Sequence, residues 1–156
     1  MSVTGGGALK SGGGLNALAL RIRGSVLARH PEWEAYAGAL PGGDLQIAVP
    51  APAGSRAGQL VILTARGEDT WVGFARPRAC YCAETERELH AVVDALLADD
   101  AFFVVVTDGD EWLETALLRP GQEPVLGEGQ VADAVSWSGR HDRIVTFTAR
   151  PPRRGA

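Results

Sequence analysis

The residue types that most often carry chemistry are few in this chain and stand far apart. The three histidines, His30, His90 and His141, belong to neither a HExxH metal motif nor a nucleophile-elbow motif. Cys80 and Cys82 enclose one residue, which is too short a loop for an unstrained disulfide, and two ligands do not complete a structural zinc site. The residues therefore predict no catalytic centre, no bound metal and no cofactor, and we expect a protein that is not an enzyme.

The two cysteines nevertheless share a defined geometry. Side chains two residues apart on a β-strand lie on the same face, so Cys80 and Cys82 would point the same way. Free cysteine is among the residue types most often buried. We expect two free, buried thiols in a reducing compartment.

Two further segments match binding motifs only in part. Residues 5–11 are glycine-rich like a phosphate loop, but Leu9 stands where a glycine must precede the lysine, and no strand comes before it. Asp108-Gly109-Asp110 begins like a calcium loop, but no glutamate closes a segment of twelve residues. The first segment is interpreted as part of a flexible leader and the second as a hairpin turn.

Acidic residues concentrate in one part of the chain. Between Glu84 and Glu128 there are twelve acidic and two basic residues, a net charge of −10, whereas the whole chain carries −4. The remainder is therefore net basic, and such an asymmetry says more about partners than about the fold. Nucleic acid is not an expected partner, because the arginines are scattered and the net charge is negative.

The acidic segment supplies the candidates for partner binding. Asp99 and Asp100 place negative charge at the end of a predicted helix, against its dipole. Trp112 is ringed by carboxylates, which suits an interface with a basic protein. The candidate partner-binding residues are Asp94, Asp99, Asp100, Asp108, Asp110, Glu111, Trp112 and Glu114. The plainer alternative is a solvated helix face followed by polar turns.

The most regular predicted element is a helix over about residues 86–98. Thr85 and Glu88 form a capping box at its start. An apolar stripe follows at helical spacing: Leu89, Val92, Val93, Leu96 and Leu97. A second helix is predicted over residues 15–29, with a strand as the alternative because alternate residues there are also apolar. Pro31 then opens a short helix that runs through Tyr36.

The other segments predict strands joined by short turns. The strand-like runs are residues 45–49, 59–65, 70–76, 79–82, 101–107, 111–118, 131–137 and 143–148. The order of elements predicts an α+β fold, in which a mostly antiparallel sheet of about six to seven strands carries one or two N-terminal helices and the central helix on one face.

The ends of the chain differ in composition from its centre. Residues 1–13 are glycine-rich and residues 150–156 hold two prolines and three arginines, so we expect a disordered leader and a disordered basic tail around a single domain at 14–149. No stretch approaches the roughly 20 apolar residues of a membrane span, and the start lacks the order of a secretory signal. We expect a cytoplasmic protein that does not contact membranes.

Several motifs resemble those of small uncharacterised bacterial proteins of the immunity-protein type. The similarity rests on Thr70-Trp71-Val72-Gly73-Phe74, on Cys80-Tyr81-Cys82, on the capped helix and following hairpin, and on residues 136–143, and it covers residues 44–148. Ala75, Arg76, Arg78 and Cys80 stand where that group has an aspartate and histidines, so no metal role is carried over. The resemblance implies a protein that neutralises a toxin by covering its surface.

These observations lead to one preferred function and two alternatives. The preferred hypothesis is a non-catalytic immunity-type protein that binds a basic toxin through its acidic surface. The first alternative is a secretion-type chaperone, a small acidic domain that forms a homodimer and holds an effector protein. The second alternative is a soluble domain with no enzymatic role, whose acidic face keeps it in solution.

Overall fold

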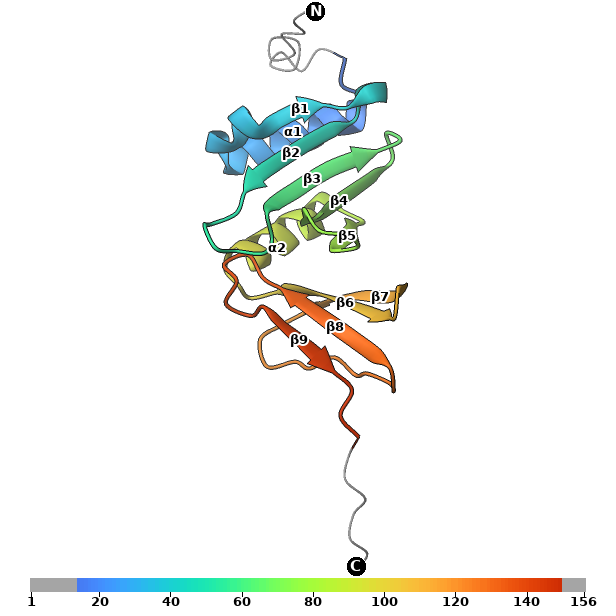
Figure 1. The fold of residues 1–156 in the computed structure, drawn as a ribbon. Helices are drawn as coiled ribbons and strands as arrows, with labels where there is room; N and C mark the ends of the chain where they lie inside the picture. The colour runs from blue at the N-terminus through green and yellow to red at the C-terminus, as the bar shows by residue number, and fades with distance from the viewer. Residues whose placement is uncertain (1–13, 150–156) are drawn as a thin grey trace, which may run out of the picture.

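The chain forms two antiparallel β-sheets and two α-helices over residues 14–149, which the computed structural model describes (Figure 1). The predicted leader, residues 1–13, and the predicted tail, residues 150–156, lie outside the described residues. The first sheet contains, in spatial order, β1 (Ala37–Ala39), β2 (Leu45–Pro50), β3 (Gln59–Ala65), β4 (Asp69–Phe74) and β5 (Cys80–Ala83). The second sheet has the order β7 (Glu111–Leu118), β6 (Phe102–Asp108), β8 (Gln130–Val135), β9 (Arg143–Thr146).

The helix α1 (Ala17–Arg29) confirms the helical interpretation of this region over the strand alternative. Asn16 caps it, because its side-chain oxygen accepts a hydrogen bond from the Ala19 amide at 2.9 Å. Ile22 and Val26, one helical turn apart, are buried against the first sheet. The predicted short helix that follows is a 3₁₀ helix, Pro31–Tyr36, and a further 3₁₀ turn spans Pro41–Gly43.

The helix α2 (Glu86–Leu97) begins at the predicted residue and ends one residue before the predicted end, with Ala98 as its C-cap. The Thr85 hydroxyl accepts a hydrogen bond from the Glu88 amide at 3.1 Å, which satisfies one of the free amides of the first turn. Its apolar stripe is buried: Leu89, Val92, Val93 and Leu96. Asp99, the residue after the C-cap Ala98, has a left-handed conformation with φ of 56°, which is common just past a helix end.

Both α-helices lie against one face of the first sheet (Figure 1). Alternation along the strands sends one set of side chains into this layer, including Ile47, Ile62 and Val72, which are fully buried. The opposite face of the same sheet carries no helix (Figure 1). The first sheet is therefore covered on one side only.

The second sheet is buried on both faces along its central strand β6. Phe103 belongs to the larger core and meets Phe74 of the first sheet edge-to-face, with ring centroids 5.2 Å apart. Phe102 points the other way, into a smaller core with Val104 and Ala132, over which Leu126 of the β7–β8 connection packs. The larger core therefore draws on both sheets.

The α+β class and the antiparallel pairing are confirmed, but the strands divide between two sheets where the sequence indicated one. β6 pairs with β7 on one side and β8 on the other, so it has no free edge for a strand of the first sheet. Strand β1 was not predicted, because Ala37-Gly38-Ala39 lacks the β-branched and aromatic residues typical of strands.

The prediction of buried thiols is wrong. Cys80 and Cys82 are free and share one face of β5, as expected, but Cys80 is exposed and Cys82 is half-buried. The physical reason is that this face of the first sheet has no covering layer (Figure 1). Neighbouring protein atoms still remove part of the water around both sulfur atoms, and this partial desolvation raises the pKa of both thiols; for Cys80 the charge of Arg78 partly offsets the effect.

Candidate partner-binding surface

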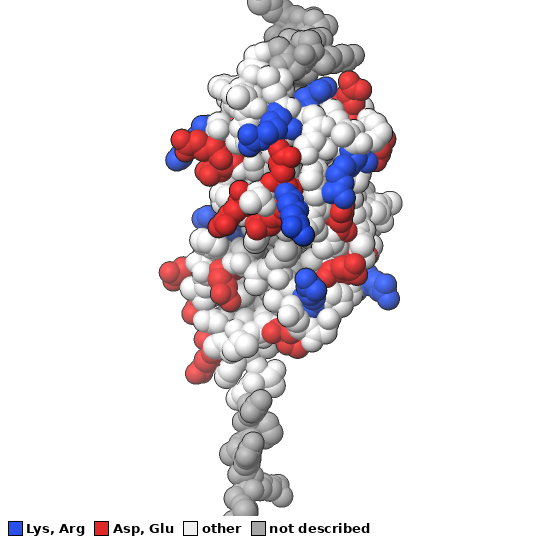
Figure 2. Space-filling model, turned by 180° about the vertical axis from the view of Figure 1, so that it is seen from behind, with Lys and Arg blue, Asp and Glu red and all other residues white. Residues whose placement is uncertain are grey.

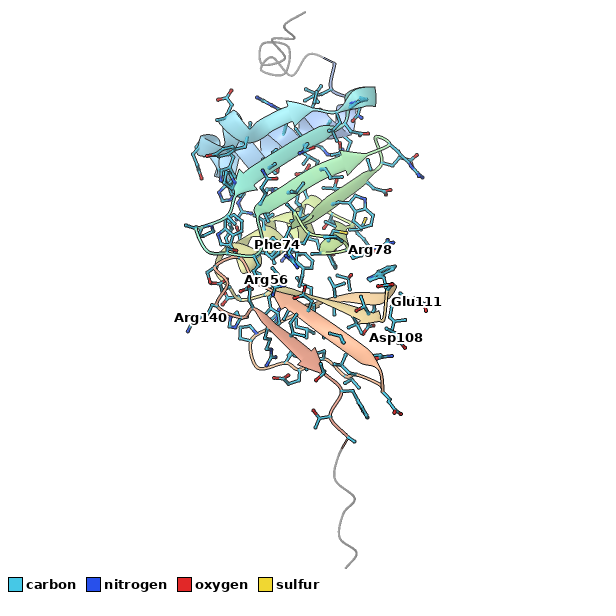
Figure 3. The ribbon with its side chains drawn as sticks, in the orientation of Figure 1. Arg56, Phe74, Arg78, Asp108, Glu111 and Arg140 are labelled. Atoms are coloured by element: carbon cyan, nitrogen blue, oxygen red, sulfur yellow. The ribbon has the colours of Figure 1, made fainter. Side chains whose placement is uncertain are left out.

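Four of the predicted carboxylates gather at the end of the β6–β7 hairpin. Gly109, with φ of 58°, makes the turn between the two strands. The acidic tip, as we call it, consists of Asp108, Asp110, Glu111 and Glu114, all exposed. Figure 3 shows Asp108 and Glu111 at the outer end of the second sheet. None of the ion pairs found in residues 14–149 involves a tip carboxylate.

A β-bulge beside the tip determines where Trp112 lies. Val106 faces Glu114 and Thr107 faces Trp112, so Leu113 is an extra residue in β7. The bulge places Trp112 on the same face as Thr115, toward the first sheet, and leaves the side chains of Trp112 and Leu113 43% and 40% exposed. An aromatic and an aliphatic side chain are therefore accessible directly beside the acidic tip.

Trp112 is also held by residues of the β4–β5 loop. The guanidinium carbon of Arg78 lies 4.6 Å from the centroid of the indole ring. The indole Nε1 donates to the Thr115 hydroxyl at 3.1 Å, and this hydroxyl donates to the Arg78 carbonyl oxygen at 2.7 Å. The three residues join the hairpin to the first sheet and fix the direction of the tip.

Two of the other candidate residues are engaged inside the molecule. Asp94 on α2 forms an ion pair with Arg29 of α1 at 2.9 Å. Asp99 accepts a hydrogen bond from the Ser138 amide at 3.1 Å, which ties the end of α2 to the loop before β9. Its left-handed backbone and this bond explain why an aspartate ends the helix in spite of the dipole.

Asp100 is exposed but lies far from the tip. It borders a groove of about 560 Å³ between α2 and β7, together with Arg119. Asp100 and Asp108 flank opposite ends of β6, which at seven residues is about 23 Å long. This separation exceeds the screening length of roughly 8 Å at physiological salt. The structure thus divides the predicted acidic surface into two parts whose charges are screened from each other.

Figure 2 shows the distribution of charged side chains from behind. Acidic side chains follow one another along one edge of the second sheet, whereas acidic and basic side chains are mixed over the helices. The mixing there reflects the ion pairs Arg21–Glu86, Arg23–Glu34 and Arg29–Asp94. Within the acidic segment, the carboxylates of Glu86 and Asp94 are thus balanced by arginines of α1, whereas those of the tip have no ion-pair partner among the described residues.

Sequence reasoning missed an ion cluster between the two sheets. Asp133 on β8 accepts hydrogen bonds from Arg56 at 2.9 Å and from Arg76 at 3.0 Å. The two arginines come from the β2–β3 and β4–β5 loops, so one carboxylate links two connections of the first sheet to the second. Asp133 itself was a signal in the sequence, because it is the single acidic residue in the otherwise apolar run 131–135 and a carboxylate there needs a partner.

The histidines lie in three separate places. His30 stacks on Trp33, His141 packs against Phe102, and His90 on α2 shares a hydrogen bond of 2.6 Å with Ser25 of α1. Burial, together with Arg29, lowers the pKa of His90 below its ordinary value. Within residues 14–149 no three histidine, cysteine, aspartate or glutamate side chains are grouped so that they could hold a metal ion.

Comparisons with protein-family models, with curated proteins and with solved structures find no match to this chain. In the described part of the chain, neither helix combines the length and the apolar character needed to cross a membrane. What can be argued about function therefore comes from the geometry of the tip and its neighbours.

Proposed function

We propose that this protein is a non-catalytic binding protein of the immunity type, which neutralises a bacterial toxin in the cytoplasm by covering a basic surface of that toxin with its acidic tip. The observation that supports this proposal is the grouping of Asp108, Asp110, Glu111 and Glu114 at one end of the second sheet, with no ion-pair partner among the described residues. Such a group attracts a basic partner and speeds its association.

The surroundings of the tip suit a specific complex better than unspecific attraction. Trp112 and Leu113 supply accessible apolar surface next to the carboxylates, and aromatic residues often dominate the energy of interfaces. The contact of Arg78 with Trp112 holds the hairpin in one orientation before a partner binds, which lowers the entropy lost on binding.

Toxin neutralisation is tested by co-expression. Genes that neighbour the one for this protein and encode basic proteins would be expressed with and without it in a host that the toxin inhibits. We expect the wild-type protein to restore growth and the double variant Asp108→Lys, Asp110→Lys to restore it poorly. If no basic neighbour is toxic, or if the double variant protects as well as the wild type, the proposal is wrong.

A matched control uses the opposite end of β6. Asp100→Lys changes an exposed carboxylate that lies outside the tip, so it should protect as well as the wild type. The alternative function, a chaperone for an effector protein, would instead raise the amount of soluble effector and leave growth unaffected.

A further inference from the structure

The face of the first sheet that lies opposite the helices is a surface that the proposed function does not use. The strand register aligns its side chains in rows across β3, β4 and β5. In one row Leu63 lies opposite Trp71 and Trp71 opposite Cys82. In the next row Val61 lies opposite Gly73. We call this surface the open face; it consists of the apolar and thiol side chains of Ala48, Val61, Leu63, Ala65, Trp71, Cys80 and Cys82, together with the polar Gln46 opposite Leu63. α1 and α2 occupy the other side of the sheet (Figure 1).

The open face is apolar although it faces outward. Its hydrophobic side chains contribute to neither core of the described residues, because alternation along β3 and β4 turns them away from the helices. The side chains of Val61, Leu63 and Trp71 are half-buried. Extended apolar surfaces of this kind on a folded protein mark sites of interaction.

Charges at the two ends of the open face have opposite sign. Side chains alternate along a strand, so Asp69 lies on the same face as Trp71, and Glu84 lies on the same face as Cys82. Desolvation raises the pKa of the Cys82 thiol most, and the charges of Asp69 and Glu84 raise it further. At the other end, Arg78 acts on Cys80 in the opposite direction. Asp69 and Glu84 therefore lie at one end of the paired strands β4 and β5, and Arg78 lies at the other end.

We propose that the open face is the contact between two copies of this chain, packed sheet on sheet around a two-fold axis that runs across the strands. A flat apolar face fits another sheet at about 10 Å. A two-fold axis across the strands places the acidic end of one copy (Asp69 and Glu84) against the basic end of the other (Arg78). A two-fold axis along the strands would instead place the two acidic ends together and the two basic ends together. The self-complementary charges therefore select a second copy of this chain as the occupant.

This arrangement leaves the acidic tip outside the contact, because the tip belongs to the second sheet. A dimer would carry two tips, and each would be able to bind a partner. The inference does not depend on toxin neutralisation, since the open face and the acidic tip share no residue. Arg78 borders both surfaces, because its guanidinium lies over Trp112 beside the tip.

The first test is the mass of the full chain in solution between about 1 and 100 µM, measured by sedimentation velocity. We expect the wild type to approach twice the monomer mass at the upper end. Trp71→Glu should stay monomeric, and Leu113→Glu, which changes an exposed apolar residue on β7, should dimerise like the wild type. A wild type that is monomeric at every concentration would overturn the proposal, whether or not another protein occupies the face.

A charge exchange tests the predicted axis and does not rely on the fold of the Trp71 variant. The double variant Asp69→Lys, Glu84→Lys makes both ends of the open face basic. The single variant Arg78→Glu makes both ends acidic. Each should associate at least tenfold more weakly with itself than the wild type does, and an equal mixture should recover the heterodimer. Self-association of both variants at wild-type strength would contradict the axis, and so would a mixture that fails to associate.

The thiols provide a third readout on the unmodified protein. Cys80 is exposed in a single copy and would be covered in the dimer. Its rate of labelling by a small disulfide reagent should fall several-fold between dilute and concentrated protein. A rate that does not change with concentration would contradict the proposed surface.

Discussion

Arg78 in the β4–β5 loop lies over the ring of Trp112 in β7, with its guanidinium carbon 4.6 Å from the ring centroid. These residues are more than thirty positions apart in the chain, and their contact joins the first sheet to the edge of the second. It depends on the bulge at Leu113, which turns the indole toward the first sheet. The orientation of the acidic tip thus follows from one irregularity in one strand.

Removal of the indole should loosen this connection. We expect Trp112→Ala to lower the free energy of unfolding by about 1–2 kcal/mol, because the contact with Arg78 and the hydrogen bond to Thr115 are both lost. Leu113→Ala, at the neighbouring exposed position, should change it by less than about 0.5 kcal/mol. Urea unfolding of the two variants measures the difference, and equal values would show that Trp112 does not hold the hairpin.

The ion cluster between the sheets should contribute more than an ordinary surface ion pair. Asp133→Ala leaves Arg56 and Arg76 close together without their shared carboxylate, and we expect a loss of about 1–3 kcal/mol. Glu123→Ala removes the exposed pair with Arg143 and should cost at most about 1 kcal/mol. Thermal unfolding in low and high salt compares the variants; a smaller effect at Asp133 than at Glu123 would refute this interpretation.

Two glycines should respond to alanine with opposite sign. A Cβ on Gly73 would stand 2.3 Å from the Ala79 carbonyl oxygen, where β4 and β5 approach closely. Gly73→Ala should therefore destabilise the fold by more than about 2 kcal/mol. Gly24 lies in α1 with open space around it, so Gly24→Ala should stabilise by about 0.5–1 kcal/mol. The midpoint of denaturant unfolding, compared with that of the wild type, measures both effects. A Gly73→Ala variant as stable as the wild type would show that β4 and β5 can move apart at this position.

Asp44 should make the fold sensitive to acid. The Asn16 amide foremost, and further donors that include the Thr64 hydroxyl and the Gly67 amide, hold the pKa of this carboxyl below its ordinary value. A depressed folded-state pKa stabilises the fold above the unfolded-state pKa, and this stabilisation is lost as the pH falls through the folded-state value.

The measurement is unfolding of the wild type and of Asp44→Asn from pH 6 down to about pH 2, the range in which free aspartate titrates. The two proteins should differ most at pH 6 and converge in acid. A difference that stays constant over this range would show that ionisation of Asp44 does not contribute.

Local elements could be predicted from the sequence because their signals are local. The cap at Thr85 and the stripe from Leu89 to Leu96 specify α2 without reference to the rest of the chain. The turn Asp108-Gly109-Asp110 likewise identified the β6–β7 hairpin. Nothing local distinguishes one sheet from two, since this depends on which strand edges remain free after β6 has gained partners on both sides.

The candidate site was predictable only in part for a related reason. The acidic residues form one run in sequence, but β6 is extended and carries Asp100 and Asp108 to its two ends. Charge density along the chain therefore overstated charge density on the surface. The partners of Asp94 and Asp99, namely Arg29 and Ser138, are distant in sequence and follow only from the packing of α1 and of the β8–β9 loop.

The central claim is that the acidic tip binds a basic partner. The most direct measurement is the dissociation constant of the purified toxin with three proteins, in low and in physiological salt. These are the wild type, the double tip variant that combines Asp108→Lys with Asp110→Lys, and the control variant Asp100→Lys. We predict that the tip variant binds at least about tenfold more weakly and loses most of its salt dependence, while Asp100→Lys behaves like the wild type. Equal affinity and equal salt dependence for all three proteins would contradict the proposed function.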